Sequence, residues 1–212
     1  MKNVLRFSFH GKVAAYSLIG LTVLLVAFSD MPVSRGVLES PLANGAANAD
    51  IKVSGTSNLH DWAMEDKDVA CTAIFTFPTA KDIVPTGLET LRVSFPVHNL
   101  KSGKSGMDSK AYTALNAKDG GNIVFTSTTS TVVPGVNRQF RVKSNGHLTI
   151  AGVMKPMVMD AACQAAPDGT ISCTGTEKMK MSDFRIKPPT YMLGALKTGD
   201  ALTIDFKLII KK

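Results

Sequence analysis

The stretch "ALTIDFKLII", residues 201–210, decides the fold class, because apolar and polar side chains alternate along it. Five large apolar residues share the even positions, Leu202, Ile204, Phe206, Leu208 and Ile210, and alternate with Thr203, Asp205 and Lys207. Successive side chains of a β-strand point to opposite faces, so this period of two puts one row on a core and the other in water. The stretch therefore predicts a strand that is buried on one face only.

The same alternation recurs along the chain, clearly in the first three of the following segments and more weakly in the others: 69–77, 91–97, 140–150, 51–57, 122–132, 154–165 and 171–183. Turn signals such as "PDGT" at 167–170 separate these segments. One stretch, 104–117, has apolar residues at helical spacing. Together these patterns predict about eight strands and one short helix.

The order of these elements indicates the fold class. No Gly-rich phosphate loop follows a strand, and the strands do not alternate with helices, which argues against a parallel α/β fold. The sequence therefore predicts an all-β antiparallel fold, either a barrel or a sandwich. A barrel is favoured because closure removes the unpaired edges of a sheet. The interior of an eight-stranded barrel is just wide enough for one slender ligand.

Residues 1–49 are predicted to lie outside the fold. Three basic residues precede an apolar run at 13–28, which is the order of a secretory signal. Ala47-Asn48-Ala49 offers a cleavage site that would leave residues 50–212, and Ala27-Phe28-Ser29 offers a nearer one. An uncleaved anchor followed by a tether up to residue 49 is the third alternative. We expect a protein exported to the periplasm, free or anchored to the inner membrane.

The cysteines predict one disulfide. Cys163 and Cys173 flank the turn at 167–170, so on an antiparallel hairpin their thiols would face each other near bonding distance. An exported protein meets an oxidising compartment, in which such a bond persists. Cys71 is then left as a buried apolar residue. No two cysteines have the Cys-x-x-Cys spacing of a zinc site, and we expect no metal and no cofactor.

The segment "NLHDW" places His60, Asp61 and Trp62 side by side and raises the alternative of an enzyme. A hydrolase would need His60 to work with a nucleophile and an orienting acid, and the chain has no G-x-S-x-G motif. Adjacent residues of an extended segment also point to opposite faces. The favoured interpretation is structural: His60 or Trp62 closes one end of the barrel.

The net charge of +7 is spread along the chain, and no Lys/Arg run is interleaved with aromatic residues. Proteins that bind nucleic acids concentrate their basic residues on one face or along one element. The charge pattern therefore argues against a nucleic-acid partner.

Four motifs carry a resemblance to a known family. "GHLTIAGVMKPMVM", residues 146–159, resembles the G-x-L-T-I-x-G-V-T-K-P-V segment of the YceI-like family, also called the lipid- or polyisoprenoid-binding family. "MKMSDFRI" (179–186) is similar to its R-S-D-F-G-I segment, and "NIVFTST" (122–128) and "TGDALTIDFKL" (198–208) resemble two of its strands. The resemblance covers about residues 51–210.

The sequence departs from the family pattern in three places. "NLHDW" stands where the family has His-Ser, and Arg185 stands where a glycine follows Asp-Phe. The Arg-Asp pair of the family's helix is represented only by "SGMDSKAY". These departures lie where the head of a ligand or the mouth of a barrel is expected.

The resemblance implies a lipocalin-like antiparallel β-barrel that holds a long isoprenoid chain in its interior. We expect a non-enzymatic carrier for a long-chain amphiphile of the polyisoprenoid, quinone or fatty acyl type. A lipid-modifying hydrolase that uses His60 and an interaction module without a cavity are the alternatives. The expected partner is the lipid, with transient contact to a membrane. The oligomeric state stays open, with a homodimer as one alternative.

Apolar residues on the inward parity of these strands, and their neighbours in the resembling segments, are the expected ligand contacts: Phe75, Phe77, Phe95, Val97, Phe125, Leu148, Ile150, Met157, Met159, Phe184, Ile204 and Phe206. Flexible thioethers adapt to an irregular apolar guest, and six lie in the last third of the chain: Met154, Met157, Met159, Met179, Met181 and Met192. Lys101, Lys104 and Arg185 are candidates to meet an anionic head group.

Overall fold

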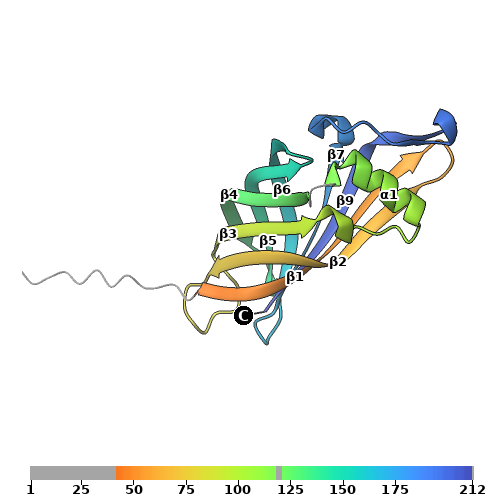
Figure 1. Ribbon diagram of the computed structural model, residues 1–212. Helices are drawn as coiled ribbons and strands as arrows, with labels where there is room; N and C mark the ends of the chain where they lie inside the picture. Colours follow the sequence, from red (N-terminus) through yellow and green to blue (C-terminus); the bar gives the residue numbers. More distant parts are fainter. Residues whose placement is uncertain (1–41, 118–120, 212) are drawn as a thin grey trace, which may run out of the picture. The chain divides into compact units, whose positions relative to one another are not determined.

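A computed structural model describes residues 42–117 and 121–211, all of which belong to one compact unit of the chain. Figure 1 shows strands wrapped into a barrel, with one α-helix near one end. The elements are β1 (Leu42–Ser57), β2 (Trp62–Thr76), β3 (Gly87–Pro96), the 3₁₀-helix η1 (Val97–Asn99), α1 (Ser105–Ala114), β4 (Asn122–Pro134), β5 (Gln139–Ile150), β6 (Val153–Ala165), β7 (Ile171–Lys180), η3 (Met181–Phe184), β8 (Thr190–Tyr191), η4 (Met192–Gly194) and β9 (Leu196–Ile210).

The sheet is a closed antiparallel barrel of eight strands. Its order is β1-β2-β3-β4-β5-β6-β7-β9, and pairing of β1 with β9 closes the ring. The short β8 pairs only with the start of β9. The predicted fold class, an all-β lipocalin-like barrel of about eight strands with one short helix, is confirmed.

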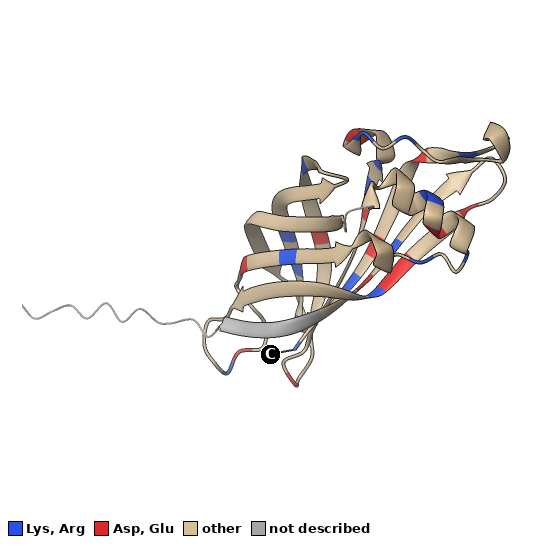
Figure 2. Cartoon of the chain, in the orientation of Figure 1, with Lys and Arg blue, Asp and Glu red and all other residues tan. Residues whose placement is uncertain are grey.

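Alternation along the strands builds the core, and β5 shows it most clearly. The even-numbered residues from Phe140 to Ile150 are buried, whereas the odd-numbered residues between them are exposed or, at Thr149, half-buried. The one buried hydroxyl in this row, on Ser144, is satisfied because its Oγ lies 2.9 Å from the Oγ of Ser130. Figure 2 shows the charged residues scattered along the strands and loops rather than gathered in one region.

The two halves of the barrel interior are filled differently. In the half that contains the β2–β3 and β6–β7 turns, Phe75 and Phe140 pack edge to face with ring centroids 6.2 Å apart. The void beside Phe75 measures only about 20 Å³, which is ordinary core packing. We call this the packed half; the other half contains the β1–β2 turn and is open inside.

Strand β1 begins earlier than the expected boundary at Asp50. Residues 42–49 pair with Val69–Thr76 of β2, and Ala47–Ala49 also pair with Leu208–Ile210 of β9. Small and polar residues such as those of "LANGAANA" have low strand propensity, which is why the segment resembles a cleavage region. The segment forms a strand because the edges of β2 and β9 pair with it, in spite of its low intrinsic propensity. The remainder of the expected leader, residues 1–41, lies outside the described residues.

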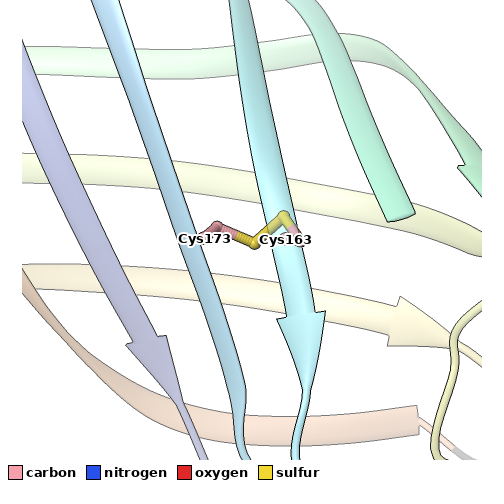
Figure 3. The surroundings of a disulfide bond; sticks show 2 residues. All are labelled: Cys163 and Cys173. Atoms are coloured by element: carbon pink, nitrogen blue, oxygen red, sulfur yellow. A yellow bond between two sulfur atoms is a disulfide. The ribbon is translucent and has the colours of Figure 1, made fainter. Parts of the chain in front are cut away.

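Cys163 and Cys173 lie directly opposite each other on β6 and β7 and are joined by a disulfide (Figure 3), with Cα atoms 4.0 Å apart. Cys71 is free and buried in β2, and burial raises the pKa of its thiol to about 12. A thiol with so high a pKa stays protonated and unreactive at neutral pH.

We expect replacement of Cys163 and Cys173 by serine to lower the free energy of unfolding by about 2–3 kcal/mol, because the closed loop is short. Urea unfolding of the oxidised protein and of the double variant measures the difference. Peptide mapping without reductant should find the two cysteines linked and Cys71 free; a link through Cys71 would contradict the pairing of β6 with β7.

Helix α1 is shorter than the predicted 104–117, because Asn116 takes a positive φ of 52° and ends it. Across residues 42–117 and 121–211, no helix has both the length and the apolar character needed to cross a membrane.

Candidate functional site

The open half of the barrel contains an apolar cavity of about 520 Å³. All eight barrel strands contribute to its wall, and α1 closes part of its end through Met107, Ala111 and Ala114. Polar side chains reach it only at a few positions, which include His60, Lys104 and Tyr191 near its mouth. A cavity of this size is in the range of small-molecule sites, and its wall suits an apolar guest.

Nine of the twelve expected ligand contacts line this cavity: Phe95, Phe125, Leu148, Ile150, Met157, Met159, Phe184, Ile204 and Phe206. The other three lie elsewhere. Phe75 lines the small void of the packed half, and Phe77 and Val97 are buried outside the cavity. Alternation identifies which residues point inward, but it does not indicate their depth along the barrel.

Of the eight methionines within the described residues, seven line the cavity: Met64, Met107, Met157, Met159, Met179, Met181 and Met192. Met154, expected among them, lies outside it and is exposed. Met64 and Trp62 lie on the inward parity of β2 and line the cavity, although the sequence pattern did not single them out as contacts. Flexible thioethers give such a wall the ability to fit tails of different shape.

Three glycines at inward positions help to keep the lumen open. A side chain at Gly55 would collide with the ring of Trp62, one at Gly146 with Phe125, and one at Gly175 with Phe206. Each ring therefore packs against a glycine of a nearby strand. Because the rings lie there, the centre of the barrel stays free for a guest.

The wall between β6 and β7 is paired over four residues only, from Ala162 to Ala165 on β6. Beyond that point the side chain of Glu177 on β7 accepts a hydrogen bond of 3.0 Å from the main-chain N–H of Asp160. The 3₁₀-helix η3 follows β7, and its buried Met181 and Phe184 line the cavity. Arg185 ends η3 with a φ of 57°, in the left-handed region that glycine adopts without steric cost. This conformation explains why the family pattern has a glycine at the position that Arg185 occupies here.

Of the three basic residues expected at the mouth, only Lys104 lines the cavity. Lys101 instead donates a 2.9 Å hydrogen bond to the hydroxyl of Tyr112, and Arg185 points into solvent. The hydroxyl of Tyr191 donates to the carbonyl of Gly106 at 3.3 Å. Burial, and secondarily the charge of Asp108, raise the pKa of Tyr191, so its hydroxyl is neutral at the mouth.

His60 lies in the β1–β2 turn, where it is exposed and lines the cavity mouth. Its Nδ1 is 3.0 Å from the main-chain oxygen of Asp61, and Trp62 donates from Nε1 to the carbonyl of Thr56 at 3.0 Å. Within the described parts of the chain, no group of three His, Cys, Asp or Glu side chains is placed to hold a metal ion. The segment thus forms the rim of the cavity.

Comparison with known proteins places this geometry in a family. The model of the YceI-like domain matches residues 52–210. No match was found among curated proteins. Several solved structures share the fold, among them the following three. BcnA of Burkholderia cenocepacia is 16% identical with a TM-score of 0.57, and the match covers 77% of this chain and 95% of BcnA.

The second is a polyisoprenoid binding domain from Saccharophagus degradans, 10% identical with a TM-score of 0.57, covering 79% of this chain and 98% of that domain. The third is a YceI protein of Campylobacter jejuni, 22% identical with a TM-score of 0.53, covering 69% of this chain and 82% of that protein. The family model spans nearly the whole described barrel. The chain therefore belongs to the YceI-like domain family.

Proposed function

We propose that this protein is a non-enzymatic carrier that holds the tail of a long-chain amphiphile inside its barrel. The cavity of about 520 Å³, with its apolar wall, is the observation that supports this most strongly. The same cavity argues against an interaction module without a cavity. The polyisoprenoid binding domain of similar fold supports a lipid as the guest.

The size of the cavity limits the length of the tail. A methylene group fills about as much space as a water molecule in the liquid, about 30 Å³. The cavity therefore accommodates a tail of about 15–20 carbon atoms, a fatty acyl chain or a short isoprenoid. Burial of a few hundred Å² of tail at about 25 cal/mol per Å² supplies several kcal/mol of binding free energy. The head group stays at the mouth beside Lys104 and Tyr191.

We expect affinity for single-chain carboxylates to rise about tenfold for every two carbons, because each CH₂ adds about 0.8 kcal/mol, and to level off near about 18 carbons. Trp62 is the only tryptophan and lines the cavity, so its fluorescence reports occupancy. An affinity that does not depend on tail length would contradict burial in the cavity.

We further propose that the protein is exported to the periplasm. The basic and apolar order of the N-terminal residues supports export. Cleavage after Ala49 would remove the first half of β1, so processing at a site that precedes Leu42, or retention of the segment as an anchor, fits the barrel better.

A further inference from the structure

Two loops at the cavity mouth project large apolar side chains into solvent. Leu59 in the β1–β2 turn is 71% exposed, and Met192 and Leu193 in η4 are 80% and fully exposed. We call residues 58–61 and 192–195 the rim loops. Monomeric soluble proteins seldom gather such side chains on one site without a partner.

Hydrogen bonds join the rim loops into one unit. The side-chain amide of Asn58 donates to the carbonyl of Ala195 at 2.8 Å, and its oxygen accepts from the N–H of Lys197 at 2.9 Å. The N–H of Asn58 also donates to the carbonyl of Lys197 at 3.1 Å. Leu59 and Leu193 are therefore carried by loops that are fixed to each other.

The backbone of η4 holds its apolar residues outward at a cost. Met192 and Leu193 have φ values of 50° and 53°, in the left-handed region that side chains other than glycine rarely adopt. No burial in the barrel compensates this conformation, because both residues are exposed. Backbone strain that core packing does not explain is typical of a site that makes contacts elsewhere.

The rim loops adjoin the cavity and have lysines beside them. His60 and Met192 line the cavity mouth. Lys197 is bonded to Asn58, and the Nζ of Lys110 lies 5.9 Å from the ring centre of Tyr191, which precedes η4. Asp61 is the one acidic residue within the two rim loops. Aliphatic tips flanked by lysines match a surface with an apolar interior and anionic head groups.

We propose that the rim loops dock the cavity mouth onto an anionic phospholipid bilayer, with Leu59, Met192 and Leu193 inserted among the acyl chains. The partner rests on the proposed function, since a carrier of a membrane amphiphile meets its cargo in a bilayer. Two protruding loop tips suit insertion into lipid, whereas a stable protein interface needs a broad, complementary surface. The tail then passes between bilayer and cavity without crossing water.

Sedimentation with vesicles tests this docking. The chain 42–212, which contains every element of the closed barrel, is mixed with vesicles of phosphatidylcholine and phosphatidylglycerol in equal parts. The double variant Leu59→Ser/Leu193→Ser should bind these vesicles at least tenfold more weakly than the parent chain. Val136→Ser is the matched control: Val136 is 73% exposed but lies in the β4–β5 turn at the packed end, and this variant should bind like the parent.

Binding should also weaken when phosphatidylglycerol is left out or salt is added, because lysines contribute to it. Equal binding of the parent and the double variant, or no binding by the parent, overturns the proposal. It is also overturned if the parent is a dimer in the absence of vesicles and the double variant a monomer, because the tips then contact a second copy. Titration with soluble single-chain carboxylates, followed by Trp62 fluorescence, tests tail binding separately. If no carboxylate binds, the proposed carrier function is refuted, and the vesicle measurements still decide whether the rim loops dock onto a bilayer.

Discussion

A chain that begins at Asp50 is expected to unfold with a free energy lower by roughly 3 kcal/mol than a chain that begins at Leu42, from the net contribution of several lost backbone hydrogen bonds. Residues 42–49 pair with Val69–Thr76 on one side, and the last three of them with Leu208–Ile210 on the other. Without them the barrel is open at that end and exposes two strand edges. Urea unfolding of the two purified chains measures the difference.

The control is a chain from Leu42 to Ile210, which lacks two C-terminal residues but keeps every strand. It tests whether shortening the chain at an end lowers stability when no strand is lost. It should unfold like the chain that continues to Lys212. Equal stability of the chains that begin at Leu42 and at Asp50 would show that residues 42–49 are not part of the barrel. Cleavage after Ala49 would then be the better account of the leader.

Replacing Phe95 by glutamine is expected to lower retention of a bound tail at least tenfold. Phe95 is 5% exposed and lines the cavity, so the variant places an amide where the tail needs an apolar wall. Ile204→Trp tests the same site without added polarity, because the larger ring occupies part of the cavity. Both variants are measured by titration with a single-chain carboxylate.

Phe75→Leu is the matched control, because Phe75 packs in the other half of the barrel. It should lower stability by about 1–2 kcal/mol and leave tail binding unchanged. His60→Gln should change retention little, since His60 is exposed at the mouth. Full retention in both cavity variants, together with a turnover that is lost in His60→Gln, would favour the lipid-modifying hydrolase. Circular dichroism must show that each variant is folded.

Most of the fold could be predicted from alternation along the strands. In β5 most of the inward residues are apolar, and in residues 202–210 of β9 every second residue is apolar; such a row indicates a core on one face only. Residues 42–49 could not be predicted in this way, because their strand is imposed by pairing with β2 and β9 rather than by their own propensity.

The site was predictable in part. Parity identifies Phe75 and Phe95 as inward, yet one lies in a packed core and the other in a cavity, because the filling of the barrel changes along its length. A signal that could have separated them is the placement of glycines at inward positions. Gly146 creates room for the ring of Phe125, and Gly175 creates room for the ring of Phe206. Phe206 itself lines both the cavity and the small void, so it lies at the boundary between the two halves.

Native mass spectrometry of the protein, purified without detergent from the cells that produce it, tests the central proposal most directly. We expect one bound amphiphile for each chain, with a tail of about 15–20 carbons, set by the cavity volume. Lipid extraction and fragmentation would identify the head group. A mass equal to that of the polypeptide alone, together with no uptake of any single-chain amphiphile added afterwards, would contradict the account.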